Sequence, residues 1–303
     1  APHSLFLMGL SAWIQYARPW SFVMTVMSVG LGGVLAFVRG WLDPLLLTLT
    51  LIGLVAFHAA TNMANDYFDV KHRVDTTEAP TARYRQHPLL GVGISPSTFT
   101  LVVAGLYIFV LSVATFIAIF RGPIVMLFTA AGLFFSYFYT ARPLMLKYRA
   151  LGEPSVILIW GPLMTGGTYY VLTGQIDIGV MAASLPLGIL VGLVLFANNI
   201  RDIEYDRSAG IKTLAIMLGQ ERSIKLYVAM IASTYVITAL LVVGRFLTPL
   251  TFLTLLTLPK AIRLIKIFRH AVPDAADPMT AQLTMKFGIT MIAGILIGSL
   301  IGI

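Results

Sequence analysis

Residues 44–69 have the sequence PLLLTLTLIGLVAFHAATNMANDYFD, an apolar run that ends in amides and carboxylates. The part Pro44–Thr61 carries no charged residue, and a bilayer is crossed by about 20 such residues in a helix. The polar side chains follow directly: Asn62, Asn65, Asp66 and Asp69. Charge in or near a bilayer is costly, so carboxylates kept there are candidates for function. The stretch therefore predicts a membrane helix with a polar site at its end.

The whole chain has the composition of a membrane protein. Of its 303 residues, 58% are hydrophobic and only 11% are charged, and the mean hydropathy is +0.87. Soluble domains carry about a quarter charged residues, so an integral membrane protein is expected. The absence of cysteine excludes disulfides and zinc–thiolate sites. The net charge of +8 is explained by membrane topology, and no nucleic-acid partner is expected.

Uncharged stretches predict an all-α, polytopic fold with nine membrane spans. These are Trp20–Val38, Pro44–Thr61, Pro96–Phe120, Gly122–Ala141, Pro154–Ile176, Ile178–Ile200, Leu226–Gly244, Phe246–Pro259 and Phe287–Ile303. The eighth span has an amphipathic extension to about Phe268, whose long basic side chains could reach the membrane surface. No linker is long enough to separate domains, so residues 1–303 are expected to form one transmembrane domain.

The distribution of basic residues predicts the orientation. With a cytoplasmic N-terminus, the cytoplasmic segments hold all but Arg39, Arg121 and Arg245 of the 21 Lys and Arg residues. Cytoplasmic loops of membrane proteins carry such an excess of positive charge. The ends of the second and sixth spans then lie on the cytoplasmic side, in the cell membrane.

A second polar cluster follows the sixth span. Asn198, Asp202 and Asp206 are spaced by four residues, which would place them on one face of a helix. The first cluster has a similar spacing, and Asp75 lies a few residues beyond it. Because each cluster follows an even-numbered span, the sequence suggests two four-helix pseudo-repeats plus one helix.

The residue types in these clusters favour magnesium. Carboxylates on one face repel each other, and a divalent cation between them relieves the repulsion. Mg²⁺ prefers hard oxygen ligands and is usually held by one or two carboxylates together with substrate phosphates. Two clusters facing each other would form a binuclear magnesium site for a lipid diphosphate. The alternative is that the acids only form ion pairs at helix ends with Arg73, Arg201 or Arg207.

A diphosphate carries more negative charge than one magnesium ion neutralises, so nearby cations would complete its binding site. The candidate diphosphate-binding residues are Asn62, Lys71, Arg73, Asn198, Arg207 and Lys212. The alternative for each basic residue is the ordinary positive charge of a cytoplasmic loop.

Three further features have two interpretations each. Tyr139 is either an interfacial anchor or a ring that stabilises a developing cation. His58 is either a helix-packing histidine, which we favour, or a base. Trp160-Gly161-Pro162 indicates a kinked helix, whose small residues either allow close packing or leave room for an isoprenoid tail.

Two segments, NMANDYFDVKHRVDTTEAPTARYR from Asn62 and FANNIRDIEYDRSAGIKTLAIMLG from Phe196, resemble the UbiA superfamily of intramembrane prenyltransferases. The resemblance is closest to its menaquinone branch, which attaches prenyl chains to 1,4-dihydroxy-2-naphthoate. Where the ubiquinone branch usually has a third acid, this chain has Arg73, and the acid comes at Asp75. The resemblance implies nine helices around a central cavity that is open sideways to lipid.

The resemblance also implies the roles of the site residues. We expect Mg²⁺ to be held by four catalytic aspartates, Asp66, Asp69, Asp202 and Asp206. Further candidate ligands are Asn62, Asn65, Asp75 and Asn198. Tyr139 would lie near the allylic cation. The expected partners are membrane lipid, a prenyl diphosphate of geranyl to geranylgeranyl length or longer, and an aromatic acceptor, with no obligate protein partner.

Other functions remain open at this point. Transfer to geranylgeranylglyceryl phosphate, 4-hydroxybenzoate or haem would use the same motifs. A CDP-alcohol phosphotransferase has a glycine after its second motif aspartate, whereas Val70 follows Asp69 here. A cation-coupled transporter usually places its charges near the bilayer midplane on broken helices. The acids here follow the ends of spans, which favours the prenyltransferase.

Overall fold

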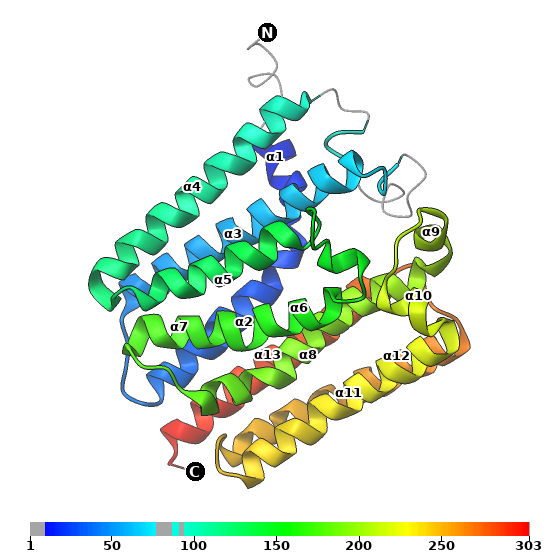
Figure 1. Cartoon of the computed structure of the whole chain (residues 1–303). Helices are drawn as coiled ribbons and strands as arrows, with labels where there is room; N and C mark the ends of the chain where they lie inside the picture. Colours follow the sequence, from blue (N-terminus) through cyan, green and yellow to red (C-terminus); the bar gives the residue numbers. More distant parts are fainter. Residues whose placement is uncertain (1–9, 77–86, 91–93, 303) are drawn as a thin grey trace.

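The computed structural model describes residues 10–76, 87–90 and 94–302, and this part of the chain is helical without a β-strand (Figure 1). Most of the expected polar loop Lys71–Ser95 lies outside the described residues, as do Arg83 and Arg85 of the predicted charge bias. The α-helices are α1 (Leu10–Tyr16), α2 (Phe22–Phe37), α3 (Pro44–Lys71), α4 (Pro96–Arg121), α5 (Ile124–Phe138), α6 (Gly152–Leu158), α7 (Met164–Thr173), α8 (Ile178–Arg201), α9 (Ile203–Ser208), α10 (Leu214–Leu218), α11 (Gln220–Val243), α12 (Leu258–His270) and α13 (Ala276–Leu300). Shorter helical turns are η2 (Pro19–Ser21), η4 (Leu146–Tyr148), η5 (Ile159–Leu163) and η6 (Pro249–Thr257).

Among the described residues, 7 helical segments are long and apolar enough to cross a membrane. They correspond to the first, second, third, fifth, sixth, seventh and ninth predicted spans. The fourth predicted span is α5, an apolar helix of 15 residues, and the eighth is divided between η6 and α12. The all-α membrane fold is therefore confirmed, while the count of nine spans stays a prediction.

Several helix boundaries differ from those predicted. Helix α3 continues past Thr61 to Lys71, so the first acidic cluster lies on the helix itself. Helix α13 begins at Ala276 instead of Phe287, and its first turn holds Asp277, which pairs with Arg201. Charge counted along the sequence cannot reveal such a partner.

Local sequence explains where the long helices begin. Asp43, Ser95 and Asp177 accept hydrogen bonds from backbone N–H groups of the first turns of α3, α4 and α8. Such caps satisfy donors that have no partner inside the helix. Helices α3 and α4 also have proline at the start, where its missing N–H is not needed.

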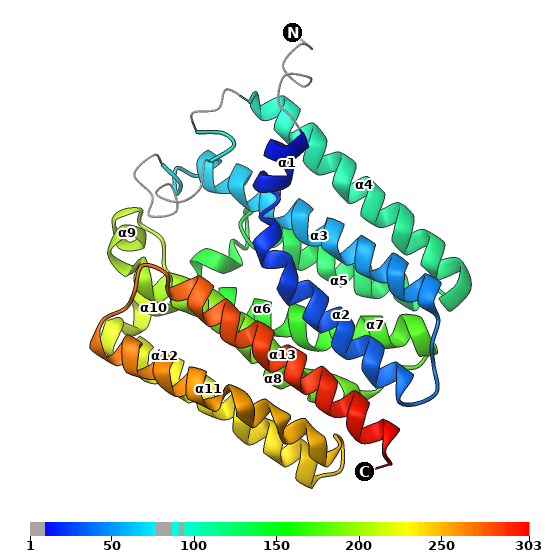
Figure 2. The same cartoon turned by 180° about the vertical axis from the view of Figure 1, so that it is seen from behind.

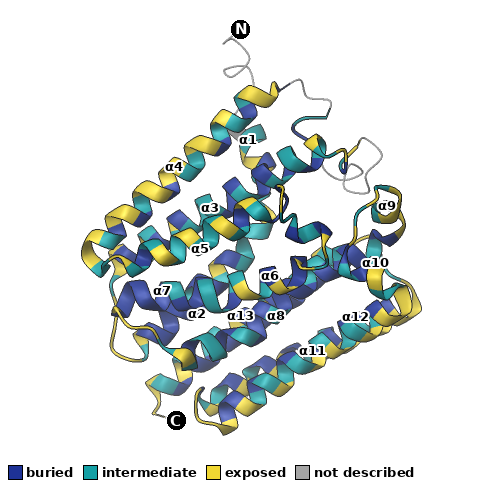
Figure 3. Ribbon diagram, viewed as in Figure 1, coloured by how far each residue is buried: buried dark blue, intermediate teal, exposed yellow. Residues whose placement is uncertain are grey.

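The helices form one bundle with a buried centre. Helix α8 packs against α11 and α13, α2 packs against α7, and α3 packs against α4. Seen from behind, α13 and α2 cross the middle of the bundle, with α11 and α12 on one outer side and α4 on the other (Figure 2). Helix α8 is largely buried, whereas α4 and α12 have many exposed residues (Figure 3).

The predicted kink at Trp160-Gly161-Pro162 is present. Gly161 has non-helical dihedrals (φ −83°, ψ −105°) within the turn η5, between α6 and α7. A Cβ atom added at Gly188 of α8 would lie 3.0 Å from the Gly161 Cα atom. The small residues therefore allow the kinked segment to approach α8 closely.

Candidate active site

The first acidic cluster lies along the C-terminal part of α3. Asn62, Asn65 and Asp69 line a large internal cavity, and the side chain of Asp66 is fully buried beside it. Asn62 donates hydrogen bonds to the carbonyl of Ala17 (3.0 Å) and to the Ser21 hydroxyl (3.1 Å). These contacts fix the amide of Asn62 at the cavity wall.

The second cluster lies where α8 ends and α9 begins. Asn198, Asp202 and Asp206 all line the same cavity as the first cluster. The expectation that they share one continuous helix face is wrong. Helix α8 ends at Arg201, and Asp202 follows with φ −95° and ψ 10° before the short helix α9. The break changes the direction of the chain at Asp202 while the three side chains stay at the cavity.

A hydrogen-bond bridge joins the two clusters at one end of the bundle. The Tyr205 hydroxyl of α9 donates to the Val74 carbonyl (2.9 Å), and the Thr76 hydroxyl lies 3.1 Å from the Tyr205 hydroxyl. Since Val74 follows α3 directly, this bridge brings together segments that are far apart in the sequence. The predicted meeting of the two clusters is therefore a feature of the structure.

The cavity below the clusters has a volume of about 860 Å³. Polar side chains from α3, α8 and α9 line one part of it, and most of the remaining lining is apolar. On α3 the residues that line the cavity extend from Asp69 back to Leu49. The part of the helix between Asp66 and Thr50 alone is about 24 Å long, at about 1.5 Å per residue. The cavity therefore combines an anionic end with a long apolar interior.

Three cations pair with the acidic residues. Arg18 forms an ion pair with Asp66, and Lys147 pairs with Asp69 at 2.8 Å. The Arg201 guanidinium contacts both carboxylate oxygens of Asp202, at 2.7 and 2.8 Å. Burial disfavours the Lys147 ammonium, but the carboxylates of Asp69 and Asp75 outweigh it and hold the pKa of Lys147 well above its usual range. Positive charge is therefore concentrated at the anionic end.

The structure does not bring the four predicted diphosphate-binding cations to the cavity. Their side chains are exposed, and none belongs to the cavity lining: Lys71, Arg73, Arg207 and Lys212. The Lys71 ammonium lies over the Tyr67 ring, and Arg207 pairs with Glu204 at 3.1 Å. The backbone carbonyl of Lys212 accepts a hydrogen bond from the Ala150 N–H group (3.0 Å), which joins these two segments of the chain. The closeness of these four residues to the acids in the sequence did not reveal that their side chains point away from the cavity.

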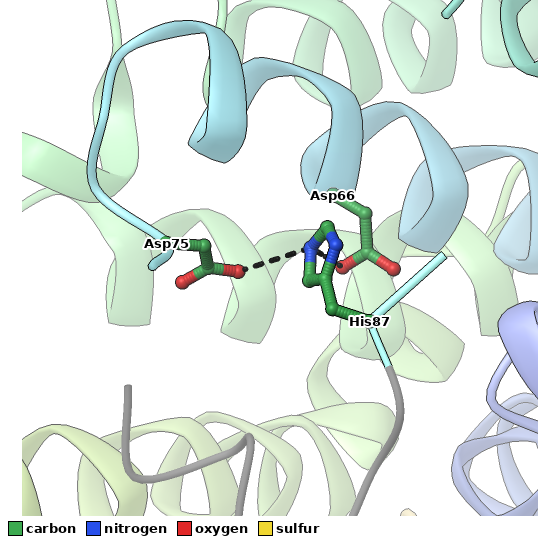
Figure 4. Close-up of side chains that lie close together, drawn as sticks. All are labelled: Asp66, Asp75 and His87. Atoms are coloured by element: carbon green, nitrogen blue, oxygen red, sulfur yellow. Dashed lines mark ion pairs between the residues drawn. The ribbon is translucent and has the colours of Figure 1, made fainter. Parts of the chain in front are cut away.

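Asp75 meets the first cluster through His87, which the sequence did not single out. The His87 Nε2 atom lies 3.5 Å from Asp75 and 3.9 Å from Asp66, so the ring stands between two carboxylates (Figure 4). Burial alone raises the pKa of Asp75, but the contact with His87 and the charges of Lys147 and Arg18 lower it to about 2. Asp75 is therefore a carboxylate at neutral pH.

Asp206 lines the cavity, where the charge of Lys147 opposes the effect of burial on the pKa of its carboxyl group. Within the described residues its side chain forms no hydrogen bond or ion pair, and burial raises its pKa to about 7. A buried carboxylate of this kind gains most from a bound cation. The donors at this end of the cavity are carboxylate and amide oxygens with one imidazole, a set that fits Mg²⁺ better than zinc or copper.

The aromatic residues fall into two groups. Tyr139 is buried at the cavity wall in a cluster with Val156 and Val191, so its predicted place near a reacting centre is compatible with the structure. His58 is a satisfied packing residue, as we favoured, because its ring nitrogens contact the hydroxyls of Thr25 (2.9 Å) and Ser21 (3.2 Å). We therefore do not assign His58 as a catalytic base.

Several residues of the site had no clear signal in the sequence. Arg18 and His87 reach the acids from distant segments, and Glu153 accepts a hydrogen bond from Asn199 (2.8 Å). Lys147 and Glu153 lie in the polar stretch between the fourth and fifth predicted spans, Gly122–Ala141 and Pro154–Ile176. Side chains that reach a site from distant helices can be assigned only when the packing is known.

The bundle and its cavity define a polytopic membrane enzyme with an anionic site above an apolar chamber. The chain belongs to the UbiA prenyltransferase family, whose family model matches residues 7–288. It is 30% identical over 294 residues to the 1,4-dihydroxy-2-naphthoate octaprenyltransferase of Bacillus subtilis, which covers 96% of this chain and 93% of the relative. It is also 30% identical over 293 residues to the human UbiA prenyltransferase domain-containing protein 1, a match that covers 95% of this chain and 84% of the relative.

Solved structures share the fold at lower sequence identity. A UbiA homologue from Archaeoglobus fulgidus bound to GPP and Mg²⁺ matches with a TM-score of 0.64 and 17% identity, covering 94% of this chain and 99% of that one. The apo structure of a UbiA homologue from Aeropyrum pernix K1 matches with a TM-score of 0.63 and 19% identity, over 90% and 97%. The protein is thus a prenyltransferase of the membrane, with the UbiA fold.

Proposed function

We propose that this enzyme transfers a prenyl group from an isoprenoid diphosphate to an aromatic quinone precursor in a Mg²⁺-dependent reaction. The observation that carries the proposal is the meeting of two acidic clusters, from α3 and from α8–α9, at one end of a single apolar cavity. The anionic end suits a metal–diphosphate group, and the apolar interior suits its hydrocarbon tail.

The metal would be held by Asp66, Asp69, Asp202 and Asp206. Asn62, Asn65, Asp75 and Asn198 are additional candidate ligands near the same end of the cavity. When bound, Mg²⁺ supplies Lewis-acid stabilisation for the negative charge that develops on the diphosphate leaving group.

The cations at the site have a second role in this proposal. Arg18, Lys147 and Arg201 neutralise Asp66, Asp69 and Asp202. Arg18 and Lys147 also line the cavity, so with a metal held by the carboxylates these two side chains would be able to donate to diphosphate oxygens, and such charge-assisted hydrogen bonds are strong. The C–O bond then breaks with its electron pair on the diphosphate, which leaves an allylic cation.

The walls of the cavity protect that cation. Tyr139 and Trp160 present aromatic rings at the cavity, and aromatic faces attract cations. The apolar lining excludes water, which would otherwise capture the cation. An electron-rich carbon of the acceptor attacks it, a C–C bond forms, and the acceptor carbon loses a proton.

The acceptor we favour is 1,4-dihydroxy-2-naphthoate. The support is the Bacillus subtilis relative, a 1,4-dihydroxy-2-naphthoate octaprenyltransferase that matches nearly the whole chain. The same chemistry on geranylgeranylglyceryl phosphate, 4-hydroxybenzoate or haem is the alternative. A structural neighbour concerned with digeranylgeranylglyceryl phosphate synthase is only 17% identical, so it supports the fold and not this acceptor.

The proposal includes the orientation inferred from the sequence, with the N-terminus and the diphosphate site on the cytoplasmic side. Arg39 and Arg121 lie at the opposite ends of α2 and α4 from this site. There Arg39 pairs with Asp177, and Arg121 donates to the Val171 carbonyl (2.6 Å). This distribution agrees with the positive-inside rule. Labelling of single cysteines placed at Arg39 and Arg73 in sealed vesicles tests it.

A prenyl-transfer assay on the purified protein tests the function. Geranylgeranyl diphosphate is supplied with each of dihydroxynaphthoate, 4-hydroxybenzoate and geranylgeranylglyceryl phosphate. We expect product with dihydroxynaphthoate, its loss in EDTA and its return with Mg²⁺. Product with another acceptor would keep the chemistry but change the acceptor. No product with any acceptor, combined with ion uptake by sealed vesicles, would favour a transporter.

The apolar part of the cavity predicts control over tail length. Ala114 of α4 is buried at the cavity wall. Ala114→Phe is expected to lower the rate with long donors relative to geranyl diphosphate by about tenfold or more, since overpacking costs about 1–3 kcal/mol. Competition between geranyl and longer diphosphates measures the ratio. An unchanged ratio would mean that the tail does not pass Ala114.

A further inference from the structure

We propose that Glu153 is a positioning residue that orients the amide of Asn199, so that the Asn199 oxygen serves as a ligand of the divalent cation. The inference rests on the proposed function, because it adds a member to the metal site. It also distinguishes the two neighbouring asparagines, whose roles cannot be separated by their position in the sequence.

Glu153 is an unusual residue for its location. It lies in the first turn of α6 and is 2% exposed, and within the described residues it forms no ion pair. Its side-chain hydrogen bond in this part of the chain comes from the Asn199 Nδ2 atom, at 2.8 Å. A buried carboxylate without a cation is costly, so its retention suggests a task beyond packing.

The chemistry of this contact fixes the orientation of the amide. The Asn199 Nδ2 atom donates to the Glu153 Oε1 atom, so the amide presents its NH₂ group to Glu153. The Asn199 oxygen atom then points away from Glu153. Asn199 lines the cavity, and its oxygen has no hydrogen-bond partner within the described residues.

The neighbouring asparagine has its oxygen engaged. The Asn198 Oδ1 atom accepts a hydrogen bond from Arg201 at 2.7 Å. Of the two tandem amides, Asn199 therefore offers the uncommitted oxygen, at the same end of the cavity as Asp202 and Asp206. An amide oxygen repels diphosphate oxygens but suits a hard cation, which identifies its partner as the metal.

The backbone is arranged to bring Glu153 to this position. Gly192 of α8 faces α6, and a Cβ atom there would lie 2.6 Å from Ile157 and 3.4 Å from the Glu153 carbonyl oxygen. The absence of a side chain at Gly192 thus lets the start of α6 approach α8. Residues that orient ligands from outside the ligand shell are a general feature of metal sites.

Binding of Mn²⁺ to the purified enzyme, followed by electron paramagnetic resonance, tests the inference without relying on activity. Glu153→Leu removes the acceptor while keeping similar bulk, and we expect the Kd for Mn²⁺ to rise about tenfold or more. Glu153→Gln keeps an acceptor oxygen, so its Kd for Mn²⁺ should lie between those of Glu153→Leu and the native enzyme. Glu221→Leu, at an exposed glutamate of α11, is the matched control.

The double variant separates positioning from a general structural role. If Glu153 acts through Asn199, adding Glu153→Leu to Asn199→Ala should not weaken Mn²⁺ binding further. Because Glu153→Leu leaves the Asn199 NH₂ group without its acceptor, the melting temperature is measured beside the affinity.

Two results would overturn the inference: native Mn²⁺ affinity in Glu153→Leu, or independent and additive losses in the double variant. A lower melting temperature with unchanged affinity would instead make Glu153 a structural tie between α6 and α8. Failure of the native enzyme to bind Mn²⁺ or to transfer a prenyl group is a separate result, which would remove the proposed function itself.

Discussion

Asp66→Ala and Asp202→Ala are each expected to lower the rate of prenyl transfer by about a thousandfold, because metal stabilisation of the leaving group is worth several kcal/mol and each 1.36 kcal/mol changes a rate about tenfold. The two residues come from different clusters, and the proposed site needs both. Asp66→Ala also removes the ion pair of Arg18, whereas in Asp202→Ala the Arg201 guanidinium keeps its pair with Asp277. The measurement is the initial rate of prenyl transfer at saturating Mg²⁺.

Two controls separate chemistry from folding. Asp66→Asn and Asp202→Asn keep the size of the side chain but remove its charge, and they should lose nearly as much activity as the alanine variants. Glu221→Ala changes an exposed acid far from the cavity and should leave the rate intact. If either alanine variant kept a rate near that of the native enzyme and remained folded, its carboxylate would not be a required ligand.

Lys147→Met is expected to lower kcat/KM for the prenyl diphosphate by about a hundredfold, the size of effect seen when one donor that stabilises a developing negative charge is removed. Lys147 is the cation of Asp69, and its own pKa keeps it charged at neutral pH. Methionine has a similar apolar stem, so the change mainly removes the ammonium. Steady-state kinetics with varied prenyl diphosphate measures the effect.

The informative comparison is Lys71→Met. Lys71 is close to the acids in sequence but exposed, with its ammonium over the Tyr67 ring. We therefore expect a much smaller effect than for Lys147→Met. The reverse order would show that the exposed cations bind the diphosphate, as their sequence positions suggested, and that Lys147 only neutralises Asp69. Lys225→Met, on the surface of α11, serves as a control for loss of charge alone.

Much of the fold could be predicted because the membrane leaves few alternatives. Apolar stretches of sufficient length must form helices in a bilayer, where every backbone polar group needs an internal partner. The limits of this reasoning appear at Asp202 and Ala276. Helix α8 ends at Arg201 and α13 begins at Ala276, and at these two boundaries Arg201 pairs with Asp202 and Asp277. Such partners are invisible to a count of charges along the chain.

The candidate site could be predicted in part for a similar reason. Carboxylates at the ends of apolar spans are costly, so Asp66, Asp69 and Asp202 stand out in the sequence. Their partners do not stand out, since an arginine or histidine is common in any polar loop. Arg18 and His87 therefore became visible only through their contacts with the acids.

The sequence alone determined the class of protein, the two acidic clusters and the oxygen chemistry that favours magnesium. Composition and spacing are enough for this, because burying a charge and removing water from backbone polar groups are costly in every membrane protein. Only the tertiary structure decided which cations face the acids, with Lys147 at the cavity and Lys71 outside. It also decided that Asn198 is engaged while Asn199 is held by Glu153. The physical reason is that the direction of a side chain is set by its packing against distant helices, which local sequence does not record.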